Sequence, residues 1–437
     1  MMNSSSPRRR VASFVAIAAV IAGAACSDFL VAENPGAIEE PDVTDPAYVN
    51  LLANGPIYAF QAAWDDVSYW NGQLADEIHN REVFIEEGQI DRRELHSDMT
   101  YMTAFTYNPL QHARFVGEDA ARRMIAILGD SAGRDLRVAR SLAYSGYAYV
   151  GLGEMNCTTP INLGVPKSSA DIFADAIQKF DSAITIATAA KTYLQTLPNV
   201  DPNVIAATDS VRFFALVGAA RAALDRNELA IASTYAAQVP PAFNFYAWYS
   251  TTLTNRVYNR LQQGSSGNLL NTPFEAMATD PRVPRLINTT ATNGKPLSPT
   301  AFTSYNGLPG NAGGVFTPAI GQRIASGLEA QYIVAEAAGP TAATSAFVDQ
   351  RRAVGGQAAL NLAAGDPAIM AELRDQRRRD LYLDNHRLGD LRRYKQFYGI
   401  DEFPSGPYPG STSGAVYNPL IDCWPLPTAE LNANPNI

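Results

Sequence analysis

Residues 135–153, DLRVARSLAYSGYAYVGLG, place apolar side chains at the spacing of an α-helix. The members of this stripe are Leu136, Ala139, Ala143, Tyr147 and Val150. Side chains three or four residues apart lie on one face of a helix. The alanines would let a second helix approach closely, and the tyrosines would fill the groove beside it. We therefore predict a helix that packs against neighbouring helices.

Similar stripes recur on both sides of this stretch. Further helices are predicted over residues 46–75, 171–187, 210–224, 225–237, 327–338 and 342–352. Asp225 and Glu228 have the spacing of a capping box, which predicts that one helix opens at Asp225. Antiparallel helix pairs with small residues at their crossings are typical of tetratricopeptide-like arrays. The expected fold class is mainly α, although any alanine-rich bundle would give the same stripes.

Two long segments rich in loop-forming residues interrupt the helices. Residues 240–318 are dense in Asn, Thr, Gly, Pro and aromatic residues. An insertion of this size in a compact domain is usually functional. Residues 403–419 are a second such segment, rich in proline and glycine. We expect both to be loop-rich excursions from the helical array.

The N-terminus has the organisation of a secretory signal. Arginines at 8–10 precede an uncharged run over 11–23, and small residues lead to Cys26. The run is too short to span a bilayer, which takes about 20 residues. A cysteine at this junction is typical of a bacterial lipoprotein, whose signal is cut before the cysteine that then carries acyl chains such as palmitate. The alternative is ordinary cleavage after Ala24, which would leave Cys26 as an incidental thiol.

These features predict three parts of the chain. Residues 1–25 are the signal peptide, 26–46 an acidic flexible leader, and 47–437 a single domain. Residues 1–25 carry three arginines and no acid, so their removal changes the net charge from −9 to −12. A strongly acidic chain is not expected to bind nucleic acid.

Two cysteines remain if Cys26 is acylated. Cys157 and Cys423 would lie in an oxidising compartment after export, where a disulfide can persist. A bond between them would close a very long loop. The alternative is two separate buried thiols, because sequence does not show whether their Cα atoms come within bridging distance.

The C-terminal region, about residues 366–437, carries the most specific pattern. It contains QRRRDLYLDNHRLGDL at 376–391 and ends with WPLPTAELNANPN at 424–436. Oppositely charged residues three or four apart pair along a helix face. We therefore interpret this region as a structural network and a C-terminal latch, with no active site. The residues assigned to them are Arg377, Asp380, Arg387, Asp390, Glu430 and Asn432.

Both segments resemble the SusD/RagB family of outer-membrane nutrient-binding lipoproteins. Members show an E-R-x-x-E-L-x-x-E-G-x-R-x-x-D-L helix and end on P-I-P-x-x-E-L-x-x-N-P. Residues 348–356 are similar to the family's N-x-V-R-x-R-A-G segment, and CSDFL with Asn34-Pro35 is similar to its mature N-terminus. The departures are Gln376, Asp380, Asp384 and Asn385, which replace three glutamates and a glycine.

The resemblance implies a SusD-like fold and a lipid-anchored protein of the outer membrane that faces the cell exterior. Such a protein captures an oligomeric nutrient, usually a glycan, and passes it to a SusC-like TonB-dependent transporter. It binds without catalysis, and the sequence carries none of the common catalytic or phosphate-binding motifs. No cofactor or metal is expected. The alternative is a tetratricopeptide-type scaffold lipoprotein that serves membrane assembly and binds protein segments.

A sugar-binding site needs flat aromatic rings flanked by short polar groups, because sugars present apolar faces edged with hydroxyl groups. We expect a first cluster in a loop that follows the first helix, and a second in the insertion, although most aromatic residues of a helical protein belong to its core. The candidate ligand contacts are Trp64, Tyr69, Trp70, Asn71, Asp76, Trp248, Tyr249 and Tyr305.

Overall fold

A computed structural model describes residues 44–80, 84–260, 267–269, 271–277, 280–283, 286–287, 297–298, 319–409, 411 and 413–437. The predictions for Cys26 and Tyr305 lie outside these residues. The chain divides into two compact units, Met1–Tyr48 and Val49–Ile437. Of the first unit only residues 44–48 are described, and they contain the short 3₁₀ helix η2 (Pro46–Tyr48). The following paragraphs concern the second unit.

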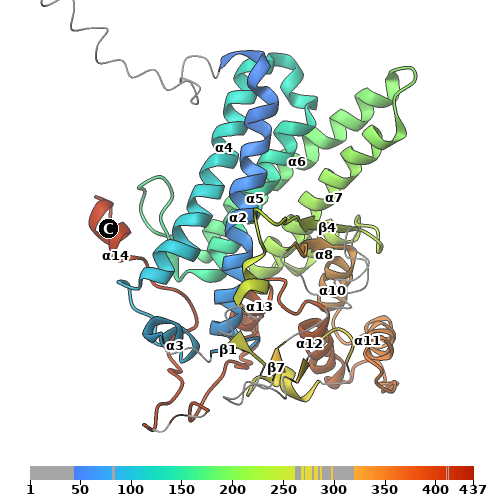
Figure 1. Cartoon of the computed structure of the whole chain (residues 1–437). Coiled ribbons are helices and arrows are strands. Elements are labelled where there is room, and N and C mark those ends of the chain that lie inside the picture. The colour runs from blue at the N-terminus through green and yellow to red at the C-terminus, as the bar shows by residue number, and fades with distance from the viewer. Residues whose placement is uncertain are drawn as a thin grey trace, which may run out of the picture. The chain divides into compact units, whose positions relative to one another are not determined.

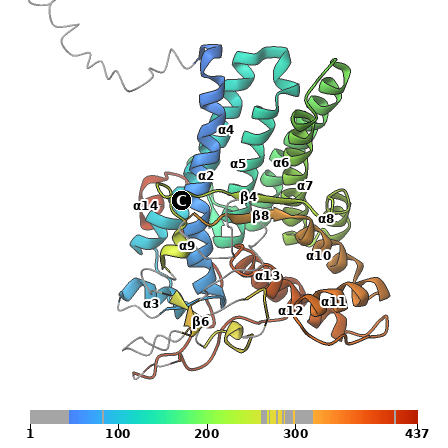
Figure 2. The ribbon, with the colours of Figure 1, turned by 45° about the vertical axis from the view of Figure 1, so that its right-hand side comes forward.

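The first half of this unit is an array of helices that pack on one another in chain order (Figures 1 and 2). They are α2 (Val49–Ala75), α4 (Asn108–Leu128), α5 (Leu136–Met155), α6 (Ser169–Thr196), α7 (Pro202–Asp225) and α8 (Leu229–Ala236). Asp135, Ser168 and Asp201 cap α5, α6 and α7 by accepting hydrogen bonds from first-turn N–H groups. The prediction of a mainly helical, tetratricopeptide-like fold is confirmed.

Glycines set the spacing within this array. Phe180 of α6 lies against Gly146 of α5 and Gly218 of α7. A Cβ atom at Gly146 would lie 2.7 Å from the Phe180 ring, and one at Gly218 would lie closer still. No larger residue fits either position without a shift of the helices. Small residues at the crossings and large rings between them therefore hold α5, α6 and α7 together, as the sequence pattern predicted.

Aromatic rings from three helices and a strand form the centre of the core. Tyr147 stacks on Phe214 with centroids 4.4 Å apart, and Phe214 stacks on Phe245 at 4.0 Å. Phe60 and Trp64 of α2 lie in the same cluster. Among the described helices, α7 alone is long and apolar enough to cross a membrane by length and composition. Its packing against α5, α6 and α8 makes it a core helix of this unit.

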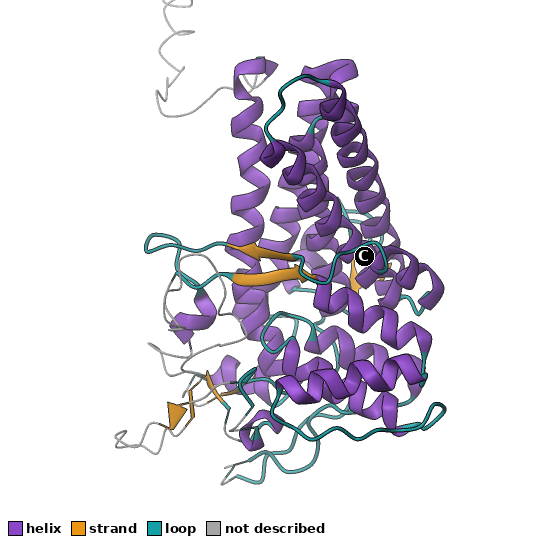
Figure 3. Cartoon of the chain, turned by 90° about the vertical axis from the view of Figure 1, so that its right-hand side faces the viewer, coloured by secondary structure: helices purple, strands orange, loops and turns teal. Residues whose placement is uncertain are grey.

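The second half of the unit is built from a strand pair and shorter helices (Figure 3). Strand β4 (Asn244–Ala247) pairs antiparallel with β8 (Gln322–Ser326), and their register shifts between Phe245 and Tyr246. The helices that follow are α10 (Gly327–Ala338), α11 (Ala342–Val354), α12 (Ala368–Asp380), α13 (Arg387–Arg393) and α14 (Thr428–Ala433).

Short elements complete the described part of the chain. They are β1 (His79–Asn80), α3 (Ile85–Asp91), η3 (Met102–Tyr107), η4 (Gly129–Arg134), β2 (Thr158–Thr159), β3 (Lys167–Ser168), α9 (Arg256–Tyr258), β5 (Gly267–Asn268), η6 (Pro273–Ala276), β6 (Leu286–Ile287), β7 (Leu297–Ser298) and η8 (Tyr394–Tyr398). Strands β1 and β5, β2 and β3, and β6 and β7 form antiparallel pairs.

The predicted capping box at Asp225 is wrong. Asp225 is the last residue of α7, and α8 begins four residues later. Asn227 adopts a left-handed backbone (φ 61°) that breaks the helix between them. The Asp225 carboxylate is buried and accepts a hydrogen bond from Arg393 at 2.9 Å. The Asp225 side chain, which the local pattern assigned to a helix cap, therefore forms a tertiary ion pair instead.

The charged residues of the C-terminal pattern form a buried structural network, but most of their partners come from other elements. Arg393 contacts Asp225 and Asp390 at 2.9 Å and Glu336 at 3.0 Å. Burial alone would raise the pKa of Asp390, yet the guanidinium groups beside it, Arg377 first, hold that pKa well below its usual range. Pairing along one helix face holds for Asp390 with Arg393, and for Asp375 with Arg378 and Arg379 in α12.

Tertiary pairs account for the other members of the network. Arg377 reaches Asp390 at 2.7 Å, and Asp380 binds Arg351 of α11 at 2.7 Å. Helix α12 ends at Asp380, so the Arg377–Asp390 pair crosses the turn to α13, whereas the Asp380–Arg351 pair joins α12 to α11. In that turn Asn385 has φ 60°, which is a left-handed backbone conformation. The family motif has a glycine at this position, and asparagine is a replacement that tolerates the same conformation. The network thus joins several helices of the second half.

A disulfide and the last residues close the fold. Cys157 and Cys423, 266 residues apart, are joined with Cα atoms 5.1 Å apart. The next residue, Trp424, is fully buried, and its backbone N–H donates to Met155 at 2.9 Å. Its indole N–H donates to Asn71 at 3.1 Å. The tail therefore binds against the ends of α2 and α5.

The contacts of the latch differ in detail from the prediction. Glu430 accepts a hydrogen bond from Asn434 within the tail and also bonds with the Tyr107 hydroxyl of η3, as predicted for an anchor, whereas Asn432 is exposed. Asn434 donates to the Gly164 carbonyl at 2.9 Å, and Asn436 donates to the Leu163 carbonyl at 2.6 Å. The asparagines at the very end therefore anchor the tail to the loop between α5 and α6.

Candidate ligand-binding site

Most of the aromatic residues predicted to contact ligand are core residues in this structure. Trp64, Tyr69 and Trp70 are fully buried. Helix α2 continues to Ala75, so the loop expected to carry them does not begin there. Trp70 packs against Tyr101 with centroids 5.0 Å apart. A ring with no accessible surface cannot stack on a sugar, so this expectation is corrected: the three rings stabilise the helix packing.

Two further candidates also have structural partners. Asn71 accepts the indole N–H of Trp424 and donates to Asn385 at 2.9 Å. Tyr249 is buried, and its hydroxyl donates to the Gln61 carbonyl at 3.0 Å. Both side chains bond within the fold, and neither lines the cavity described below.

Trp248 is the predicted aromatic residue that lies on the surface, with 45% of its area exposed. Its ring lies beside that of Tyr246, with centroids 5.6 Å apart. The two rings belong to β4 and the loop that follows it. Trp248 is not among the described residues that line the cavity around β1, which is considered next.

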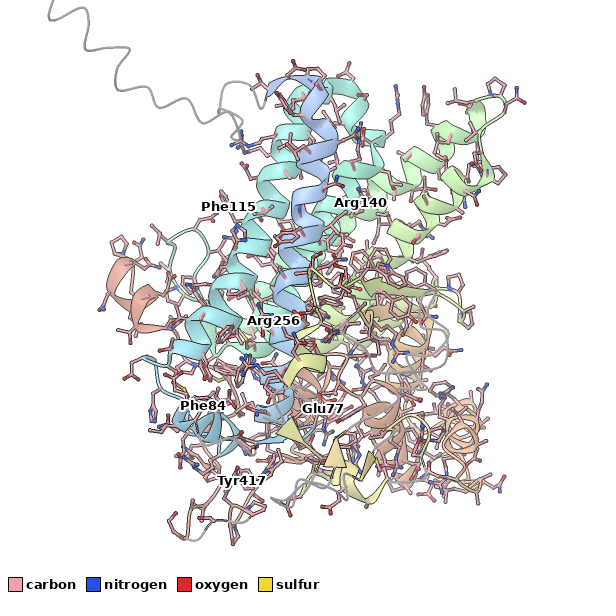
Figure 4. All side chains as sticks on the ribbon, viewed as in Figure 1. Glu77, Phe84, Phe115, Arg140, Arg256 and Tyr417 are labelled. Carbon is pink, nitrogen blue, oxygen red and sulfur yellow. A yellow bond between two sulfur atoms is a disulfide. The ribbon has the colours of Figure 1, made fainter. Side chains whose placement is uncertain are left out.

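Asp76 lies in a cavity of about 400 Å³ that four separate segments enclose. These are the end of α2 with β1, the end of α3, the turn before η6, and the loop over residues 402–417. The polar residues that line it are Gln73, Asp76, His79, Asp91, Asn271, Thr272, Glu402, Ser405 and Tyr417. In Figure 4 the cavity region lies at the bottom of the view, where Tyr417 is labelled below Glu77. A cavity of this size fits a small ligand or one end of an oligomer.

The 402–417 loop is fastened to the rest of the cavity by an arginine. Arg93 donates to the Ile421 carbonyl at 2.7 Å and to the Pro404 carbonyl at 2.9 Å. Its guanidinium group lies 4.3 Å from the ring centroid of Phe403. The Tyr408 hydroxyl donates to Asp91 at 2.5 Å. One wall of the cavity is therefore held in place although it contains no helix.

Three of the nine polar residues of the walls are carboxylates, which when ionised only accept hydrogen bonds. Asp76 binds Arg387 through both oxygens, at 2.8 and 2.7 Å. Asp91 accepts from the Asn80 N–H at 2.9 Å and lies 3.0 Å from His79. Tyr417 supplies an aromatic ring, and burial raises the pKa of its hydroxyl, so it remains a neutral donor. Acceptors beside an aromatic ring are groups that bind sugar hydroxyls and a sugar face.

Sequence reasoning pointed to two of the four walls of this cavity and missed the other two. Asp76 was a candidate, and residues 403–419 were expected to be a loop. Asp91, Asn271 and Tyr417 carry no local signal, because they come together only through tertiary packing. A search for loops anchored by buried arginines could have pointed to the 402–417 wall.

Glu77 lies directly behind the cavity and makes protein stability depend on pH. Burial raises its pKa to about 8, and it accepts a hydrogen bond from the Leu383 N–H at 2.8 Å. An unfolded glutamate has a pKa of about 4.3. The folded chain therefore holds this proton more tightly, and the folded state loses stability as the pH rises between those two values.

The neutral variant Glu77→Gln is expected to raise the free energy of unfolding at pH 8 by on the order of 3 kcal/mol, with little effect near pH 5. Urea denaturation at the two pH values measures this difference. Asp98→Asn, which changes an exposed carboxylate, is the control. An equal effect of Glu77→Gln at both pH values would contradict the assignment.

Comparison with known proteins identifies the fold. No family model matches the sequence, and no curated protein matches it. A SusD superfamily protein from Bacteroides thetaiotaomicron superposes with a TM-score of 0.64 at 12% identity, covering 90% of this chain and 98% of that one. One from Bacteroides fragilis gives 0.61 at 15% identity, covering 90% and 99%. Surface glycan-binding protein A from Bacteroides uniformis gives 0.56 at 11% identity, with 90% and 99% covered.

These similarities run through almost the whole chain. The protein has the fold of the SusD superfamily, as the C-terminal motifs implied.

Proposed function

We propose that this protein is a nutrient-binding lipoprotein that captures a glycan at the outer membrane. It delivers the glycan to a SusC-like TonB-dependent transporter and breaks no bond. The observation that carries the proposal is the SusD fold, shared over 90% of the chain with structures that include a surface glycan-binding protein. The aromatic and acceptor-rich cavity supports it, because it is suited to sugar hydroxyls.

The N-terminus supplies the anchor in this proposal. Cys26 carries acyl chains, and residues 27–46 separate it from the folded unit. Replacing Cys26 with Ala is expected to abolish incorporation of labelled palmitate and to release the protein from membranes. Incorporation that persists in the variant would contradict anchoring through Cys26.

Glycan binding is tested with the purified protein on an oligosaccharide array. In this proposal a second part of the oligosaccharide stacks on Trp248, outside the cavity, so we expect Trp248→Ala to weaken binding about tenfold or more, with the melting temperature unchanged. The matched control is Tyr58→Ala, since Tyr58 is an aromatic residue of α2 with 63% of its area exposed. Trp70→Ala is unsuitable, because removing a fully buried ring destabilises the fold.

Each outcome separates the alternatives. Unchanged binding by Trp248→Ala would remove that residue from the site. An array without any bound oligosaccharide would contradict glycan capture. Co-purification of membrane-assembly proteins in place of a transporter barrel would then favour the scaffold alternative.

A further inference from the structure

The cavity beside Asp76 has a strong excess of acceptors over cations. Three of its lining residues are carboxylates, namely Asp76, Asp91 and Glu402. Among the described residues that line it, none is a lysine or an arginine. Arg387 lies behind the wall and already binds Asp76 at 2.7 Å and Glu402 at 3.3 Å. A negatively charged group entering the cavity would therefore meet carboxylates without a free cation to offset them.

Gln73 gives a second and independent indication of the ligand. Its side chain lines the cavity, and only 1% of the residue is exposed. The amide nitrogen donates to the Tyr69 hydroxyl at 3.2 Å, whereas the amide oxygen has no hydrogen-bond partner among the described residues. Buried acceptors are almost always paired, and leaving one unpaired destabilises a fold. A ligand that donates a hydrogen bond would pair this oxygen.

The carboxylates on the cavity walls would also bind a ligand that donates hydrogen bonds. Asp76 and Asp91 are fixed by hydrogen bonds from Arg387, Asn80 and Tyr408, but each carboxylate can accept about four bonds in all. Sugar hydroxyls can donate to the positions that remain. An ionised carboxylate or sulfate on a sugar has no proton to donate.

We propose that this cavity holds an uncharged, hydroxyl-rich sugar unit and rejects units that carry uronate or sulfate. The proposal rests on the proposed glycan-binding function and names the substrate class within it. The fixed acceptors of Gln73, Asp76, Asp91 and Glu402 provide the selectivity. A neutral unit pairs them with hydroxyl groups, and an acidic unit brings like charges together in a partly desolvated space.

The test uses the full-length protein and an array printed in matched pairs. Each pair has one oligosaccharide backbone, with and without a uronate or sulfate group. We expect the bound glycans to be neutral, and the acidic member of each bound pair to bind at least tenfold more weakly. Equal or tighter binding of the acidic members would overturn the selectivity while leaving glycan capture intact. An array with no bound member would contradict the proposed function itself.

Two variants test the residues that carry the selectivity. Gln73→Met removes the unpaired oxygen, so we expect at least tenfold weaker binding of the neutral glycan with an unchanged or higher melting temperature. Glu402→Gln removes one charge from the rim but keeps an acceptor oxygen, so we expect the ratio of acidic to neutral binding to rise severalfold. Asp130→Asn, which removes an exposed charge in η4, is the control for net charge. Unchanged ratios of neutral to acidic binding in Glu402→Gln would also overturn the proposal.

Discussion

Replacing Arg393 with Met is expected to destabilise the protein by about 3–5 kcal/mol. Arg393 is buried and contacts three buried carboxylates, those of Asp225, Glu336 and Asp390. Removing the shared cation leaves negative charges uncompensated in an interior from which water is excluded. Methionine keeps much of the side-chain volume, so the measured loss reports on charge and hydrogen bonds more than on packing. Urea denaturation at pH 7 measures the change in the free energy of unfolding.

The pH dependence of this loss distinguishes charge from packing. In the variant the orphaned carboxylates bind protons more tightly when folded than when unfolded, so its deficit should shrink as the pH is lowered towards 5. Arg122→Met is the matched control, because the Arg122 side chain is 68% exposed and pairs with Asp119 on the surface. A control loss below about 1 kcal/mol is expected. A deficit for the Arg393 variant that does not change with pH would point to packing instead.

Removing the disulfide is expected to cost on the order of 4 kcal/mol. Cys157 and Cys423 close a loop across a sequence separation of 266 residues, so the bond restricts the unfolded chain strongly. The variant in which both cysteines are serine is compared with the parent by chemical denaturation. The parent should lose this stability when a reductant is added, and the variant should not respond. A parent whose stability is unaffected by the reductant would show that the bond contributes little.

The helical array was predictable because its evidence is local. The apolar stripe predicted over residues 135–153 lies in α5. Small residues of this helix lie where it packs against its neighbours α4, α6 and α7. The C-terminal motifs predicted the SusD fold for the same reason, since their residues lie close together in the sequence. Asp225 shows the limit of local evidence. Its capping pattern was present, but Arg393, 168 residues away, determines what its side chain does.

The candidate site was less predictable, because exposure is a tertiary property. Trp70 and Trp248 have the same chemistry, yet one is fully covered and the other is 45% exposed. Local sequence does not separate them, since the rings that cover Trp70 belong to the segment around Tyr101 and Phe105. The cavity walls present a similar difficulty. Gln73 and Tyr417 line the same cavity although they are far apart in sequence, and Arg93 fastens the 402–417 loop that carries Tyr417.

The burial of Trp424 has a consequence for the order in which the chain can fold. Its indole group completes the hydrogen bonding of Asn71, which lies 353 residues earlier in α2. The ribosome makes α2 well before Trp424, so the last turns of α2 gain this partner only after the residues between them have been synthesised. Contacts so distant in sequence form late and slowly. In a chain that we propose to be exported, the last turns of α2 would therefore stay incompletely packed until Trp424 has been made, which favours translocation before folding is complete.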